Sequence, residues 1–348
     1  MATSARARRR ARGRAKDEAS FRTKFPGHLI VVTPPILCCS EPGKLRGVLD
    51  FLESLASIVM GATSPVVMDM RHCQKVDPAA CVLLESQIQR CEATYGTKFE
   101  FQLPKDGRTK FTLAIFGVAG DERYQPDQLR QFAAHIMRVT SGAKGEPSPG
   151  ERTFEIARLA ELLADPTVAD RVHGALNEAA DNVLSWAYGA NSSNPSERWW
   201  VAGILSPKHG ATFIALDRGV GIPATAPKNL GDSLQGAMAV LRRDRLWTDL
   251  SVPPADWQVL WATIRQKRTL SRLDERGKGL TNMVELIDKF QSGRIVILSG
   301  DAIYNYEVKP DAPEPKEHCG PLGYRFPGTM VIWWLEADKR KAKLRNVD

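Results

Sequence analysis

A carboxylate and a carboxamide four residues apart are the first candidates for chemistry in this chain. Glu178 and Asn182 lie in the segment Val172–Tyr188, where apolar residues recur every three or four positions, which predicts an amphipathic helix. Residues four apart are neighbours on a helix surface, so the two side chains would project together. Such a pair could hold a hard cation and a water molecule to be activated. The same spacing is also typical of a solvated polar stripe.

A second candidate follows a predicted strand, Thr212–Leu216. Asp217 comes directly after this strand, and Gly219 and Gly221 follow with one residue between them. Glycines let the backbone approach a flat ligand closely, and a carboxylate can accept a hydrogen bond from an exocyclic amine. Adenine recognition needs this combination, although two spaced glycines are also common in ordinary turns.

Two further segments complete the candidate site. Gly277, Lys278 and Gly279 form a flexible loop before a helix that is predicted to begin near Leu280. Free N–H groups at a helix start, together with a lysine, favour phosphate binding. Near the end of the chain, Thr329 follows a glycine and leads into a predicted buried strand.

The elements that must position these residues belong to two regions. Three predicted strands (His28–Thr33, Pro65–Met70, Lys98–Leu103) alternate with two helices (Lys44–Met60, Pro78–Tyr95), which is typical of a small α/β sheet. A segment with one predicted helix, Pro126–Thr140, and a run rich in Gly, Pro and Ser then connects to the second region. The predicted fold class is α/β (α+β). Its parts are a basic disordered tail over residues 1–25, an α/β domain over 26–120, a connecting helix and linker over 121–150, and a second domain over 151–345.

The formal charge of +8 comes from one end of the 348-residue chain. Residues 1–16 contain six arginines and one lysine without an acid, and the rest has 41 bases against 40 acids. A mobile polycation of this kind could bind nucleic acid by counterion release, or could simply be a solubilising extension.

Composition excludes several classes of protein. The chain is 43% hydrophobic and 25% charged, which is ordinary for a globular protein, and no apolar stretch approaches the roughly 20 residues of a membrane helix, so we expect no membrane contact. Its six cysteines form no C-x-x-C pair. A zinc site or disulfide framework is therefore not expected, and reduced thiols suggest a cytoplasmic location.

Taken in order, the four motifs resemble the GHKL ATP-binding fold of DNA gyrase B, the Hsp90 chaperones, MutL, histidine kinases and anti-sigma-factor serine kinases. The resemblance covers Val168–Leu335 and implies an α/β sandwich, the Bergerat fold, with ATP and Mg²⁺ as ligands. It implies that Asn182 holds Mg²⁺ and that Glu178 positions and deprotonates the attacking water. It also implies that Asp217 reads the adenine amine in a pocket shaped by Gly219 and Gly221. The lid over the phosphates would be Gly277, Lys278 and Gly279, and Thr329 would support an adenine-bound water.

The anti-sigma-factor serine kinases are the group most similar in local sequence, through EAADNVLSWAY, DRGVGIP and ERGKGLTNMVELID. The chain departs from them at Lys278, which lies between the lid glycines, and in a long insertion, Ala224–Arg272. The first region is similar to STAS domains, the anti-sigma-factor antagonist type, over Val66–Leu84. In those domains a serine accepts phosphate at the turn where this chain has Ala79.

These resemblances imply a Mg-ATP-binding GHKL-type ATPase, an ATP hydrolase that acts as a nucleotide-dependent conformational switch or regulator of a partner protein. Two alternatives stay open: a protein serine kinase of the anti-sigma-factor type that acts in trans, and a non-catalytic ATP-sensing scaffold. A histidine kinase is disfavoured, since His135 lacks the acid that follows the phosphoacceptor. The hypothesis leaves a homodimer open.

Overall fold

The computed structural model describes residues 21–118, 135–143, 166–183, 187–188, 197–206, 210–230, 238–239, 241–247, 251–270 and 279–336. Within these ranges the chain mixes helices with β-sheets, which confirms the predicted α/β (α+β) class. The arginine-rich segment 1–16 and the lid residues Gly277 and Lys278 lie outside them. None of the described helices has the length and apolar character needed to cross a bilayer.

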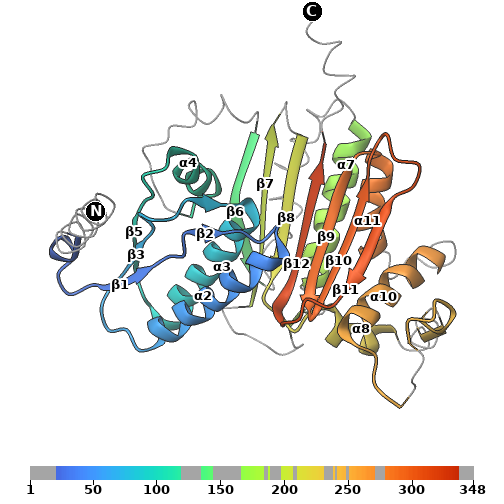
Figure 1. Ribbon diagram of the computed structural model, residues 1–348, viewed down its shortest axis with the longest axis horizontal. Coiled ribbons are helices and arrows are strands. Elements are labelled where there is room, and N and C mark those ends of the chain that lie inside the picture. The colour runs from blue at the N-terminus through green and yellow to red at the C-terminus, as the bar shows by residue number, and fades with distance from the viewer. Residues whose placement is uncertain are drawn as a thin grey trace, which may run out of the picture.

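The first region forms a small parallel sheet with helices packed on it (Figure 1). Its strands have the order β1-β3-β5, with β1 at Leu29–Val32, β3 at Val66–Asp69 and β5 at Phe99–Gln102. Two short strands, β2 (Ile36–Leu37) and β4 (Lys75–Val76), pair separately. The helices are α2 (Pro42–Met60), α3 (Pro78–Tyr95) and α4 (Gly107–Phe116). The three predicted strands and two predicted helices are confirmed, whereas α4 was not predicted.

The start of α3 shows how local sequence determines an element here. Asp77 is the N-cap, and its Oδ1 accepts a hydrogen bond from the backbone N–H of Ala80 at 2.8 Å. Pro78 occupies the first helical position, where its missing N–H costs nothing. The Oδ2 atom of the same aspartate accepts from the backbone N–H groups of Cys39 and Ser40. One side chain therefore caps the helix and fixes the loop before α2.

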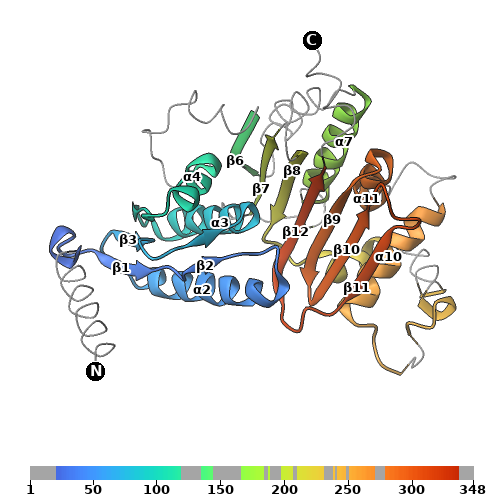
Figure 2. The same ribbon diagram turned by 45° about the horizontal axis from the view of Figure 1, so that its top comes forward.

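The second region is built on a seven-stranded antiparallel sheet with the order β11-β10-β9-β12-β8-β7-β6. The strands are β6 (His135–Ala143), β7 (Arg198–Ser206), β8 (Gly210–Asp217), β9 (Gly293–Gly300), β10 (Ala302–Val308), β11 (Lys316–Gly320) and β12 (Phe326–Leu335). The helices are α7 (Pro166–Asn182), α8 (Ile222–Leu230), α10 (Asp256–Leu270) and α11 (Gly279–Phe290). Figure 2 shows this sheet beside the smaller one.

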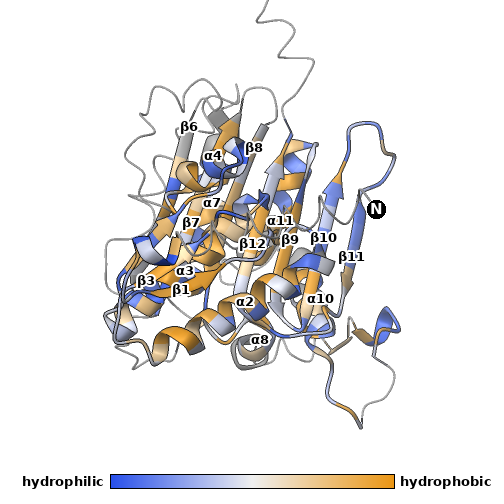
Figure 3. Cartoon of the chain, turned by 60° about the vertical axis from the view of Figure 1, so that its left-hand side comes forward, coloured by the Kyte–Doolittle hydropathy of each residue, from blue (hydrophilic) through white to orange (hydrophobic). Residues whose placement is uncertain are grey.

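Both faces of the large sheet are covered, by different parts of the chain. Successive strand residues point to opposite faces. On β8, Phe213 and Ala215 join the core formed with α7, α10 and α11, whereas Ile214 and Leu216 join the core formed with α2 and α3. Trp200 on β7 is fully buried on the α2–α3 side, and its Nε1 donates to Gln89 of α3 at 2.9 Å. Figure 3 shows that the facing surfaces are largely hydrophobic.

Two sequence predictions are wrong. The predicted helix Pro126–Thr140 is a strand over its described part, because residues 135–143 form β6 and pair with β7 at the edge of the large sheet. Cross-strand pairing has overridden a pattern that also fits a helix. Residues 21–24, which lie within the segment 1–25 that was predicted to be disordered, are helical. Phe21 is buried there, with the Arg71 guanidinium 3.7 Å from its ring centroid.

Candidate functional site

Three buried polar side chains meet at the edge of the large sheet that is formed by the ends of its central strands, β8, β12 and β9. Thr329 of β12 pairs with Asp217 of β8 on one side and with Ser299 of β9 on the other. All three alternate in phase with the residues that face α7 and α11, so their side chains lie on that face of the sheet. We call Asp217, Ser299 and Thr329 the edge cluster.

Asp217 is the charged member of the edge cluster. It is only 6% exposed, and its Oδ1 accepts from the backbone N–H groups of Gly219 at 2.8 Å and Thr329 at 3.2 Å. Burial raises the pKa of this carboxyl to about 6, although these hydrogen bonds favour its ionised form. Neither backbone donor uses Oδ2. The Thr329 hydroxyl also hydrogen-bonds this carboxylate. A carboxylate has about four acceptor positions, so a donor from a ligand can add to these contacts.

Ser299 connects the members of the edge cluster and was not predicted. Its hydroxyl is fully buried, lies 3.0 Å from the Thr329 hydroxyl and accepts from the backbone N–H of Ile222 at 2.8 Å. The last contact holds the start of α8 against the sheet. A serine at the end of an apolar run, GRIVILSG, is the only trace of this role in the sequence.

The predicted glycines shape the loop after Asp217. A Cβ on Gly219 would lie 2.2 Å from the carbonyl oxygen of Ala187, so no larger residue fits without a backbone shift. Gly221 has φ of +89°, which disfavours other residues, and a Cβ there would lie 2.9 Å from Ser299 Oγ. The backbone N–H of Val220 donates to the Ala187 carbonyl at 3.1 Å. The loop is therefore packed between the edge cluster and the chain that follows α7.

Helix α7 carries the other two predicted residues, Glu178 and Asn182. Pro166 opens this helix, its α-helical part ends at Asn182, and Val183 and Ala187 have π-helical geometry within the predicted segment Val172–Tyr188. Both side chains are partly buried and lie one turn apart, near the end that approaches the edge cluster. The structure brings Gly219 and Thr329 into hydrogen-bonding contact with Asp217, places Gly221 against Ser299, and adds α7 beside them.

Tyr188 links the end of α7 to the loop of Asp217. Its hydroxyl donates to the carbonyl oxygen of Arg198 at 2.8 Å and accepts from the backbone N–H of Arg218 at 3.1 Å. Burial, followed by the nearby Asp217, raises the pKa of Tyr188 to about 12. The phenol therefore stays protonated and keeps its donor role over the physiological pH range.

Helix α11 brings its first residues to the same edge. It ends at Phe290, and β9 begins at Gly293, so helix and strand run in opposite directions. Gly279, the first residue of α11, therefore lies toward the Ser299 end of β9. Side chains of α7 and α11 pack in one core. The N-terminal N–H groups of α11 are natural donors for an anion placed at this edge.

The side chains suit a magnesium ion that arrives with a phosphate ligand. The described residues contain no group of three or more His, Cys, Asp or Glu side chains that could form a metal cage. Mg²⁺ usually keeps several waters and takes one or two protein oxygens together with phosphate oxygens. Glu178 and Asn182, neighbours on one helix, offer oxygen donors of this kind.

Comparison of the chain with protein-family models, with curated proteins and with solved structures finds no match.

Proposed function

We propose that this chain is a GHKL-type ATPase that binds Mg-ATP and acts as a nucleotide-dependent switch or regulator of a partner protein, with a STAS-like first domain. The observation that carries the proposal is the edge cluster. A buried carboxylate, Asp217, accepts from the backbone N–H groups of Gly219 and Thr329 through Oδ1 and lies on the face of the sheet that α7 and α11 cover. The order of motifs along the chain gives independent support.

The edge cluster would recognise the base of the nucleotide. Oδ2 of Asp217 would accept a hydrogen bond from the exocyclic amine of adenine, and the Thr329 hydroxyl would hold a water against the ring. Gly219 and Gly221 would shape this pocket, because the loop after Asp217 packs so closely that a Cβ at either position would clash. The phosphates would extend toward Gly279 and the lid residues Gly277 and Lys278.

Helix α7 would supply the chemistry at the phosphates. Bound Mg²⁺ would neutralise phosphate charge, and the side-chain oxygen of Asn182 would hold the ion. Glu178 would orient a water molecule and accept its proton, which requires the carboxylate to lie within one water of the γ-phosphate. Hydrolysis of ATP would therefore require Glu178, whereas ATP binding would not.

The test compares ATP binding and phosphate release in the full chain and in Glu178→Ala. We expect the variant to bind ATP with nearly unchanged affinity in calorimetry and to lose phosphate release by 100-fold or more, roughly the contribution of a general base. Asp181→Ala removes an exposed carboxylate from the same helix and is the matched control, with unchanged hydrolysis. If the wild-type chain does not bind ATP, the proposal is wrong. Equal rates of phosphate release in Glu178→Ala and Asp181→Ala would show that Glu178 is not the general base.

A trans-acting protein serine kinase is the second candidate, and one feature of the first domain bears on it. Ala79, which replaces the phosphoacceptor serine of STAS domains, is buried in the first turn of α3 and has no hydroxyl. Any phosphoryl transfer to a STAS-type acceptor would therefore go to another chain. Transfer of label from γ-labelled ATP to a partner protein, without free phosphate, would favour the kinase. ATP binding with neither reaction would favour a sensing scaffold.

A further inference from the structure

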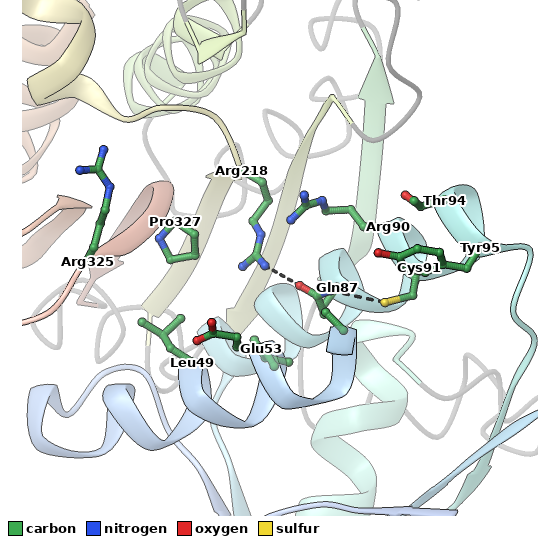
Figure 4. Close-up of a pocket in the computed structure, with 12 residues that line it drawn as sticks. Leu49, Glu53, Gln87, Arg90, Cys91, Thr94, Tyr95, Arg218, Arg325 and Pro327 are labelled. Carbon is green, nitrogen blue, oxygen red and sulfur yellow. Dashed lines mark hydrogen bonds between the residues drawn. The ribbon is translucent and has the colours of Figure 1, made fainter. Parts of the chain in front are cut away.

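A second candidate site lies on the opposite face of the large sheet. A cavity of about 360 Å³ opens between α2, α3 and the loops beside β8 and β12 (Figure 4). Its walls are Leu49, Leu52, Glu53, Ala56, Gln87, Arg90, Cys91, Thr94, Tyr95, Arg218, Arg325 and Pro327. This volume is in the range of pockets that hold small molecules.

The charge of the lining is strongly unbalanced. Three arginines, Arg90, Arg218 and Arg325, line the cavity with a single acid, Glu53. The formal charge of the wall is therefore two positive units. In Figure 4 the three arginines come from three separate parts of the fold: α3, the loop after β8 and the loop before β12.

Strand alternation explains why Arg218 lies here. Asp217 faces α7 and α11, so the next residue points to the side of the sheet that α2 and α3 cover. Its Nη2 donates to Oε1 of Gln87 on α3, whose Nε2 in turn donates to Cys91 Sγ at 3.4 Å. The backbone of Arg218 thus belongs to the loop of the edge cluster, while its side chain reaches the first domain.

The guanidinium groups of this cavity keep unused donors. Arg218 Nε and Nη1 and Arg90 Nε are buried without a hydrogen-bond partner among the described residues. Burial, followed by repulsion from Arg90, lowers the pKa of Arg218 to about 10. Two cations that face each other with buried, unpaired donors are costly. An anion between them would satisfy the donors and remove the repulsion.

We propose that this cavity binds a small molecule through a phosphate group held by Arg90 and Arg218. A phosphate monoester carries about −1.5 to −2 charges at pH 7, which balances the lining, and its three oxygens suit the fork of a guanidinium. The side chains of Leu49, Leu52 and Ala56 provide an apolar wall for the organic part of the ligand. The site is separate from the proposed ATP site, because it lies on the other face of the sheet, although the backbone of Arg218 belongs to the loop of the edge cluster.

The test uses the full chain with phenyl phosphate and inorganic phosphate as probes, compared with potassium chloride at equal ionic strength. We expect phenyl phosphate to bind in calorimetry and to raise the unfolding temperature. Arg90→Gln should weaken this binding by tenfold or more and abolish the thermal shift. Arg108→Gln removes an exposed arginine from α4 and is the control for net charge, with the shift retained.

A second readout separates a binding role from a structural one. In chloride alone, Arg90→Gln should be at least as stable as the wild type, because the substitution removes one of two neighbouring like charges that have buried donors without partners. Lower stability in chloride would make Arg90 a structural residue and overturn the proposal. An equal phosphate response in Arg90→Gln and the wild type would overturn it as well. Neither outcome depends on whether the chain binds ATP.

Discussion

Replacing the buried carboxylate of Asp217 by an amide should raise the stability of the protein and abolish its binding of ATP. In Asp217→Asn, the amide oxygen can take over the bonds from the N–H groups of Gly219 and Thr329, so the loop keeps its geometry. The substitution removes only the charge. The amide nitrogen would then stand where Oδ2 stood and would present a donor to the adenine amine. We expect ATP binding to be lost while the protein becomes more stable.

The size of the stability change follows from the pKa of Asp217. Burial raises this pKa from 3.8 to about 6. The folded state then binds more protons than the unfolded state between these values, so this group costs stability as pH rises through that window. By linkage the cost grows from about 0.5 kcal/mol at pH 4 to about 3 kcal/mol at pH 8. Asp217→Asn has no such cost, so its advantage should grow with pH.

The assay is urea unfolding of both proteins at pH 4, 6 and 8, with ATP affinity measured at pH 8 by calorimetry. The expected result is a stability advantage of Asp217→Asn that increases with pH, up to about 3 kcal/mol, and an ATP affinity too weak to detect. If the difference in unfolding free energy between the two proteins were the same at all three pH values, ionisation of Asp217 would not be the cause of the stability cost. Wild-type ATP affinity in the variant would refute the proposed adenine contact.

The remaining predictions concern packing around the edge cluster. Urea unfolding measures the stability of each variant, and calorimetry measures its affinity for ATP. Gly219→Ala should destabilise the protein by about 1–3 kcal/mol and weaken ATP binding, because its Cβ would lie 2.2 Å from the Ala187 carbonyl. Gly174→Ala on α7, where no atom lies within 4 Å of the new Cβ, is the control and should stabilise by about 0.5–1 kcal/mol; equal effects would refute the steric argument. Ser299→Ala should cost about 1–3 kcal/mol, because the buried N–H of Ile222 loses its acceptor; a neutral substitution would show that the hydroxyl is not needed there.

Elements with strong local signals could be predicted from the sequence. Asp77 and Pro78 mark the start of α3, and Pro166 marks the start of α7. A buried terminal strand after Gly328 and Thr329 was predicted from the apolar run that follows them, and β12 extends over Phe326–Leu335. These signals act over a few residues, so they do not depend on the rest of the fold.

Features that depend on distant partners could not be predicted. The segment His135–Ala143 became a strand because β7 pairs with it from about sixty positions along the chain. The contact of Ser299 with Thr329 depends on the register between β9 and β12, and the direction of Arg218 depends on the alternation of β8. Asp217, Gly219, Gly221 and Thr329 were chosen by motif, and their contacts appear only when the sheet is assembled.

The core between the large sheet and helices α2 and α3 makes the two sequence regions mutually dependent. Trp200, Leu216 and Ile332 lie in one buried cluster with Leu52 and Leu83 of the first region. Separating the regions would expose the apolar residues of this shared core on both pieces. We therefore expect the two regions to unfold together. The two faces of the large sheet, one with the proposed ATP site and one against the first region, would then form and be lost together.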